Sequence, residues 1–161
     1  FLFNGTIADN IRFGKPDATE EEIIQAAKTA QAYDFIMEKE HGFEEEITEG
    51  ATNVSGGQKQ RLSIARALVR KPDIYVFDDS FSALDFKTDA TLRKDLKKVT
   101  ANSIVMVVAQ RISSIMDADR IVVLNEGNVI GMGTHRELLK SCEIYKEIAL
   151  SQLSEEELAH E

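Results

Sequence analysis

One stretch of the sequence has the residue types and spacing to hold a phosphate group. It runs over residues 54–68 and reads Val-Ser-Gly-Gly-Gln-Lys-Gln-Arg-Leu-Ser-Ile-Ala-Arg-Ala-Leu. A helix that opens with a serine and two glycines directs free backbone N–H groups and the positive end of its dipole toward one point. The glycines allow an anion to approach the backbone closely. Ser55 either caps the helix or donates its hydroxyl to a phosphate oxygen, and an ordinary Ser-Gly cap accounts equally well for Ser55, Gly56 and Gly57 alone.

A second stretch, Ile74-Tyr75-Val76-Phe77-Asp78-Asp79, pairs an apolar run with two carboxylates. A buried strand that ends in carboxylates can hold Mg²⁺ through water and orient an attacking water molecule. A strand that ends in a polar loop is the alternative, and such strands are common.

The positions of helix caps, breakers and apolar residues predict the elements around these stretches. Thr19 and Glu22 are spaced as a capping box for a helix over about 20–40, and Thr134 and Glu137 for another near the C-terminus. Pro72 closes a helix over about 55–70. Further elements are a buried strand at 74–77, a helix at 86–99, a buried strand at 103–109, a short helix near 112–116, and strands at 120–124 and 129–131 joined by a turn at 126–128. The tail after Ser154 is expected to fray.

The order of these elements defines the expected fold class. Residues 1–71 are mainly helical, whereas residues 72–161 alternate strand and helix. Such alternation favours an α/β fold with a mostly parallel sheet covered by helices.

Composition excludes several classes of protein. Hydrophobic residues make up 43% and charged residues 29%, which is typical of a globular chain. The net charge of -9 disfavours a nucleic-acid binder, which needs a basic surface. No apolar run approaches the roughly 20 residues that cross a bilayer, so we expect a soluble chain. The single cysteine, Cys142, excludes an internal disulfide and is expected to pack in the interior, and the histidines lack metal-ligand spacing.

Taken together, the motifs resemble the ATP-binding domain of ABC transporters. Residues 54–68 resemble the ABC signature, 74–79 the Walker B strand, and Ser82-Ala83-Leu84-Asp85 the D-loop, all in the family's order. The resemblance implies a P-loop NTPase-like, RecA-like core in its C-terminal half, preceded by the ABC helical subdomain at residues 1–71. It also implies that ATP and Mg²⁺ are the cofactors.

The resemblance assigns a role to each candidate residue. It places Ser55, Gly56, Gly57 and Gln58 on a nucleotide held by a partner subunit, and Asp85 in the loop at the subunit interface. It makes Asp78 the Mg²⁺ ligand. Asp79 stands where the family has a catalytic glutamate, and Gln110 where it has a switch histidine. Glutamine can hydrogen-bond a phosphate but cannot become a cation.

Three features refine this expectation. The chain contains no Gly-x-x-x-x-Gly-Lys-Ser/Thr motif, so we expect the P-loop and the Q-loop glutamine upstream of Phe1 and the isolated chain to be inactive. The opening residues 1–11 and the acidic Glu49 resemble drug or lipid exporters. Because Asp79 and Gln110 both depart from the pattern, we expect this subunit's own site to hydrolyse ATP poorly.

These features leave the function open between classes. We expect an ATPase subunit that powers export at the cytoplasmic face of the membrane. Its expected partners are transmembrane domains and a second ATPase domain, the latter in a heterodimer or in a homodimer with slow turnover. A soluble ABC ATPase in DNA repair or ribosome work is the second reading, and the exporter-like opening argues against it. A non-catalytic interaction module is the third.

Overall fold

The computed structural model describes residues 1–153, and at Glu49 it describes the backbone but not the side chain. These residues form two compact units, one over Phe1–Met106 and one that begins at Val107. The division at residue 71 that the sequence suggests separates helical from strand-rich sequence, and it stays a prediction. The tail after Ser154 lies outside the described residues.

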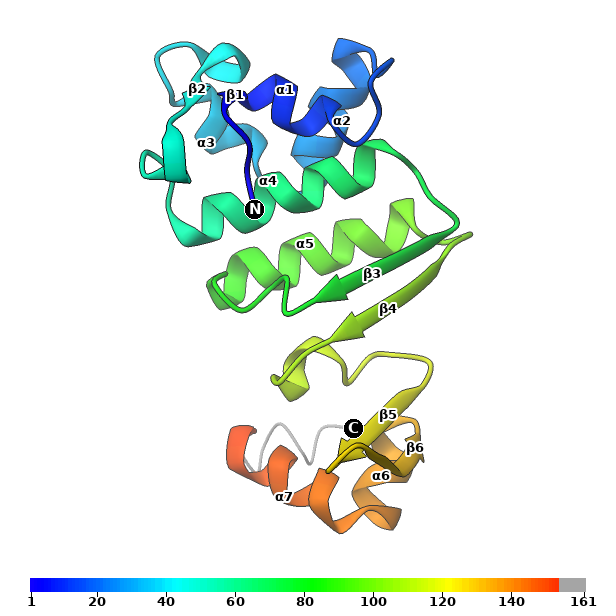
Figure 1. Cartoon of the computed structure of the whole chain (residues 1–161). Helices are drawn as coiled ribbons and strands as arrows, with labels where there is room; N and C mark the ends of the chain where they lie inside the picture. Colours follow the sequence, from blue (N-terminus) through cyan, green and yellow to red (C-terminus); the bar gives the residue numbers. More distant parts are fainter. Residues whose placement is uncertain (154–161) are drawn as a thin grey trace. The chain divides into compact units, whose positions relative to one another are not determined.

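Helices dominate the first unit (Figure 1). They are α1 (Ile7–Arg12), α2 (Glu20–Thr29), α3 (Tyr33–Met37), α4 (Gly56–Val69) and α5 (Phe86–Val99). A small antiparallel sheet joins β1 (Gly5–Thr6) to β2 (Glu46–Ile47), and single 3-10 turns lie at Gly42–Glu44 and Glu49–Ala51. Helix α4 packs against α1 and α2 and buries Leu62, Ile64, Ala65, Leu68 and Val69. The helix predicted over 55–70 is therefore confirmed, with Ser55 as its N-cap.

The predicted capping boxes are confirmed as well. Thr19 accepts a hydrogen bond from the Glu22 backbone while the Glu22 side chain accepts from Thr19, and Thr134 and Glu137 repeat the pattern. Helix α1 also begins with a capping box, formed by Thr6 and Asp9, within a segment for which the sequence predicts no helix.

The single helix predicted over 20–40 is wrong, because the structure ends α2 at Thr29 and starts α3 at Tyr33. The break is a Schellman ending: the Ala32 N–H donates to the Ala27 carbonyl and the Gln31 N–H to the Lys28 carbonyl. Gln31 takes the left-handed conformation that glycine usually supplies there, with φ 56°. No glycine marks this helix end, so the pattern of apolar residues runs across it.

Strands β3 (Ile74–Asp78) and β4 (Ile104–Val108) pair, and α5 connects them. Both arrows point the same way in Figure 1, so β3, α5 and β4 form a parallel β-α-β motif, as the α/β prediction requires. The prediction that both strands are fully buried is wrong. In β3, Tyr75 and Phe77 are buried, whereas Ile74 and Val76 are 55% and 63% exposed. In β4, Ile104 and Met106 are also exposed. A continuous apolar run needs cover on both faces, and the described part of the chain covers one face of β3.

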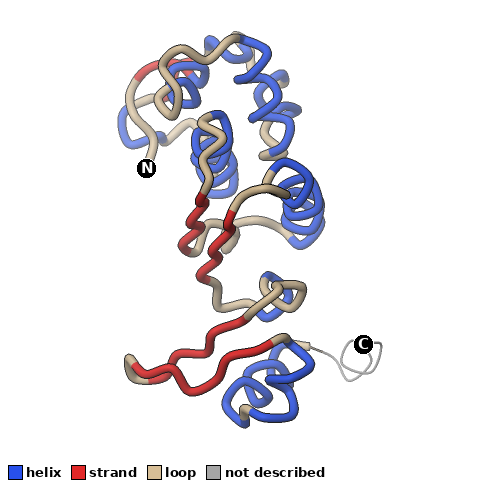
Figure 2. Tube along the Cα trace, turned by 90° about the vertical axis from the view of Figure 1, so that its right-hand side faces the viewer, coloured by secondary structure: helices blue, strands red, loops and turns tan. Residues whose placement is uncertain are grey.

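The second unit contains a hairpin and a helix pair (Figure 2). Strands β5 (Ile121–Asn125) and β6 (Asn128–Gly133) are antiparallel across the predicted turn, where Glu126 and Gly127 have positive φ. Helices α6 (His135–Ser141) and α7 (Glu143–Gln152) follow, and the short helix predicted near 112–116 is a 3-10 turn over Ile112–Ser114. Cys142 is buried in this unit's core, as predicted, together with Ile112, Ile121, Val123, Leu138, Tyr145 and Ala149.

Candidate functional site

The start of α4 is built around a reciprocal cap. The Ser55 hydroxyl accepts from the Gln58 N–H at 3.2 Å, and the Gln58 side-chain oxygen accepts from the Ser55 N–H at 2.9 Å. The first N–H groups of a helix have no partner within the helix, and here they belong to Gly56 and Gly57. Because Ser55 accepts the cap bond, its hydroxyl proton is still available for an oxygen of a ligand.

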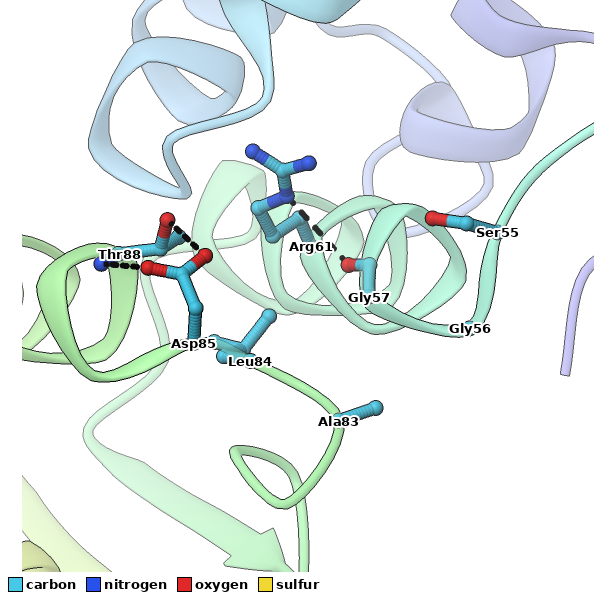
Figure 3. Close-up of a pocket in the computed structure, with 8 residues that line it drawn as sticks. All are labelled: Ser55, Gly56, Gly57, Arg61, Ala83, Leu84, Asp85 and Thr88. Atoms are coloured by element: carbon cyan, nitrogen blue, oxygen red, sulfur yellow. Dashed lines mark hydrogen bonds between the residues drawn. The ribbon is translucent and has the colours of Figure 1, made fainter.

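A pocket of about 480 Å³ opens at this helix start (Figure 3). It brings together four of the predicted site residues, namely Ser55, Gly56, Gly57 and Asp85. Gln58 lies one residue further into the helix, where its side chain completes the cap. The full lining is Ser55, Gly56, Gly57, Arg61, Ala83, Leu84, Asp85 and Thr88. We call this the signature pocket.

Arg61 gives the signature pocket a positive charge that the sequence reasoning did not single out. Its guanidinium donates to the Gln31 carbonyl at 2.7 Å and lies 4.7 Å from the centre of the Phe35 ring. Burial lowers the pKa of Arg61, which nevertheless stays charged at any physiological pH. Its bond to Gly57 O at 3.4 Å, drawn in Figure 3, keeps it beside the helix start. The contact with Gln31 spans 30 residues, so the local pattern gave no signal for it.

Asp85 reaches the signature pocket as the N-cap of α5. Its carboxylate accepts from the Thr88 N–H at 2.9 Å and from the Thr88 hydroxyl at 2.7 Å. The backbone and side-chain bonds from Thr88 lower the pKa of Asp85. The carboxylate is thus held in place as an anion at the pocket edge.

Asp78 and Asp79 lie at the C-terminal end of β3, and both side chains are exposed. They line a different pocket of about 280 Å³, which Gln60 and Ser80 also border. Asp79 adopts a left-handed backbone with φ 47°, a conformation that costs most residues about 1–2 kcal/mol and aspartate less. Within residues 1–153, no group of three or more His, Cys, Asp or Glu side chains could hold a metal by itself.

Gln60 was also missed by the sequence reasoning. Its amide nitrogen donates to the Asp79 carbonyl and the Ser82 hydroxyl, each at 3.2 Å, and its oxygen accepts from the Ala83 N–H at 3.0 Å. The pocket with the carboxylates and the signature pocket are therefore joined by one loop, which a residue of α4 holds.

Gln110 follows the end of β4 and belongs to the second unit, which begins within that strand. The Gln152 amide donates to the Gln110 carbonyl at 2.8 Å, and the Gln152 oxygen accepts from the Ile112 N–H at 2.9 Å. The last residue of α7 thus fixes the backbone on both sides of Arg111. Nothing in the sequence near Gln110 indicates this partner, which lies 42 residues away.

A partly buried polar cluster at the far end of α4 helps to fix the position of this helix. Arg66 donates to the Asn10 carbonyl and side-chain oxygen, both at 2.9 Å, and to the Phe1 carbonyl at 2.9 Å. Asn10, only 2% exposed, also donates to the carbonyls of Phe3 and Thr6. This cluster ties α1 and the N-terminal segment to α4.

Comparison with known proteins identifies the family. Residues 2–82 match the family described as ABC transporter. This match covers half of the chain. It includes the start of α4, the carboxylates Asp78 and Asp79, and most of the loop that joins the two pockets. The chain belongs to the ABC transporter family, with the P-loop NTPase class of fold that this implies.

Curated relatives agree. The chain is 46% identical over 155 residues to an uncharacterised ABC transporter ATP-binding protein of Mycobacterium bovis, covering 94% of the chain and 26% of that protein. It is 45% identical over 148 residues to a Bacillus subtilis protein named, provisionally, as a multidrug export ATP-binding/permease protein, covering 92% and 26%. The chain therefore spans about a quarter of the length of these relatives.

A solved structure of a bacterial Atm1-family ABC exporter with ATP bound is similar as well. It has a TM-score of 0.90 and 38% sequence identity, over 96% of this chain and 27% of that one. Among residues 1–153, no helix is both long and apolar enough to span a membrane.

Proposed function

We propose that this chain is part of the ATP-binding and ATP-hydrolysing domain of an ABC exporter that moves small molecules, drugs or lipids, across a membrane. The observation that carries the proposal is the pairing of two sites in one unit. The signature pocket and the Asp78–Asp79 carboxylates lie at opposite ends of one loop. The relatives named as ATP-binding and export proteins support the same function.

The residues present suit ATP and Mg²⁺. The N-terminus of the 14-residue helix α4 offers N–H groups, a dipole and the nearby Arg61 to a phosphate. Mg²⁺ is usually bound by one or two carboxylates together with phosphate oxygens and water. The exposed Asp78 supplies one such carboxylate, and Mg²⁺ held there would neutralise charge on the phosphates.

Each site residue has a distinct role in the proposed mechanism. Ser55, Gly56 and Gly57 contact the terminal phosphate of a nucleotide held by the partner ATPase domain, and Gln58 keeps the Ser55 cap in place. Asp79 accepts a proton from the attacking water of this subunit's own site. Gln110 hydrogen-bonds the terminal phosphate without carrying positive charge. Asp85 anchors the loop at the interface between the two domains.

The proposal includes an asymmetric pair of sites. Aspartate in place of glutamate withdraws the base by about one methylene, and a positioned base is typically worth about 10² to 10⁴ in rate. The signature residues are intact. We therefore propose a heterodimer in which this subunit completes the partner's active site while its own site turns over slowly.

The proposal places the domain at the cytoplasmic face of a membrane, against transmembrane domains and a second ATPase domain, with no role for nucleic acid. ATP binds the closed pair of domains more tightly than the open one, and this difference in affinity drives closure. The substrate is selected by the transmembrane domains.

The test is ATP turnover by the full-length transporter that contains this sequence, reconstituted in liposomes. Asp79→Glu combined with Gln110→His should raise turnover about tenfold or more. Asp78→Asn should abolish turnover at this subunit's site, whereas Asp73→Asn, at an exposed aspartate before the same strand, should change nothing. Unchanged turnover in the double variant would refute the degenerate site, and a transporter without ATP-dependent transport would refute the function.

A further inference from the structure

The loop between β3 and α5 is fastened at both ends to one side chain. We define it as the 79–83 loop. Gln60 donates to the Asp79 carbonyl at the start of the loop and accepts from the Ala83 N–H at its end. The Ser82 hydroxyl, which also accepts from Gln60, donates to the same Asp79 carbonyl at 3.1 Å.

These bonds need a carboxamide. Gln60 uses its nitrogen as donor and its oxygen as acceptor at the same time, which neither a carboxylate nor an ammonium group can do. A glutamate there would place an oxygen against the Asp79 carbonyl oxygen. The neighbouring Lys59 takes no part, because its ammonium group donates to the Gly50 carbonyl at 3.2 Å.

The start of the loop is also where its backbone is strained. Asp79 has φ 47°, and such residues persist when surrounding contacts hold them. The apolar anchors of this segment are Phe81 and Leu84, which are 3% and 5% exposed. Gln60 and Ser82 supply the polar contacts at the Asp79 carbonyl, and Gln60 is the one of the two that lies outside the loop.

The end of the loop forms a wall of the signature pocket. Ala83 and Gly57 both line that pocket, and a Cβ atom on Gly57 would lie 3.0 Å from the Ala83 carbonyl oxygen. A shift of Ala83 would therefore change the space available at the helix start. Because Gln60 bonds to both Asp79 and Ala83, it links the backbone positions of these two residues.

We infer that Gln60 is a positioning residue that couples the two nucleotide sites which this domain serves. It fixes the backbone of Asp79 in the subunit's own site and the Ala83 wall of the pocket that completes the partner's site. The inference rests on the proposed function. A shift of about 1 Å in a catalytic arrangement can cost about 10²-fold in rate, so a loss of about tenfold is expected when the three contacts are removed.

The experiment compares Gln60→Ala and Gln60→Glu with the unaltered full-length transporter. The matched control is Gln25→Glu, which makes the same chemical change at an exposed position of α2. Hydrogen exchange of peptides covering residues 79–84 reports the loop, and the ATP dependence of turnover separates kcat from KM. Thermal unfolding checks that each variant is folded.

The expected result is faster exchange in the 79–84 peptides and a kcat about tenfold lower at nearly constant KM, in both Gln60 variants and not in the control. Ser82→Ala should cost less in the Gln60→Ala background than in the unaltered transporter, because the two side chains share one set of contacts at the Asp79 carbonyl. Unchanged exchange, or faster exchange with unchanged kcat, would overturn the positioning role. Absence of ATP turnover in the unaltered transporter would instead refute the proposed function, and the role of Gln60 with it.

Discussion

The Arg61 guanidinium donates to the backbone carbonyl of Gln31 at 2.7 Å, and Gln31 is the left-handed residue that ends α2. The side chain of Gln31 in turn donates to the Asp95 carboxylate of α5 at 2.9 Å. One residue at a helix end therefore contacts both the helix of the signature pocket and the helix that follows the Asp85 cap.

Replacing Arg61 with lysine tests this connection. Lysine keeps the charge but loses the planar donor group that reaches Gln31 and stacks on Phe35. We expect the free energy of unfolding to fall by about 1–2 kcal/mol, measured by urea denaturation. Arg70→Lys is the control, because Arg70 is exposed at the other end of α4. Equal effects of the two variants would contradict the role of Arg61.

Adjacent glycines provide a second test. A Cβ atom at Gly57 would lie 3.0 Å from the Ala83 carbonyl oxygen, whereas one at Gly56 would make an ordinary contact of 3.7 Å with the Ala83 side chain. We expect Gly57→Ala to lower ATP turnover of the transporter several-fold more than Gly56→Ala, because it displaces the backbone of the pocket wall. Steady-state ATPase assays decide the order, and a reversed order would mean that the helix start and the loop are not in this contact.

Replacing Asn10 should destabilise the fold much more than replacing an exposed asparagine. Its side chain serves Arg66, Phe3 and Thr6 from a site that is 2% exposed. Asn10→Ala removes several hydrogen bonds of partly buried groups and empties a buried site, so we expect a loss of about 2–3 kcal/mol in the free energy of unfolding. Asn102→Ala, in an exposed turn, should change it by less than about 0.5 kcal/mol. A small effect at Asn10 would show that water replaces its contacts.

The Asp85 cap of α5 should make the stability of the protein depend on pH in the acid range. Hydrogen bonds from Thr88 lower the pKa of Asp85, so the ionised form is favoured by folding. The cap therefore contributes stability above about pH 4 and loses it as the pH falls through the lowered pKa. Carbon-detected NMR titration should show the Asp85 pKa rising in Thr88→Val. Thr91→Val, one turn further along the helix, should leave it unchanged, and a rise in both variants would point to a general loosening of α5.

Local signals predicted much of the first unit. The capping residue Thr19 locates the start of α2, and Ser55 locates the start of α4. Pro72 locates the end of α4 to within about one residue. The signature residues and Asp85 could be expected to share a site because their order resembles that of a known family. The contacts of Gln60, Arg61 and Gln152 could not be expected, because they join residues 19 to 42 positions apart that no local pattern relates.

Two failures have different physical causes. The break at Gln31 was missed because a non-glycine residue takes the left-handed position, at a cost that its contacts with Arg61 and Asp95 offset. The exposure of Ile74 and Val76 was missed for another reason. An apolar strand indicates that its faces need cover, but it does not indicate which residues of the chain provide that cover.

The left-handed backbone at Asp79 restricts which residue types fit that position, apart from any catalytic requirement. Aspartate and asparagine enter this region several-fold more readily than other side chains, and β-branched residues hardly enter it. Of the two acidic residues, aspartate therefore relieves conformational strain, while in the proposed mechanism it is the weaker base. Asp79→Glu should therefore lower the thermal stability of the protein while it speeds the proposed catalysis, a trade-off often found where an active site stores strain.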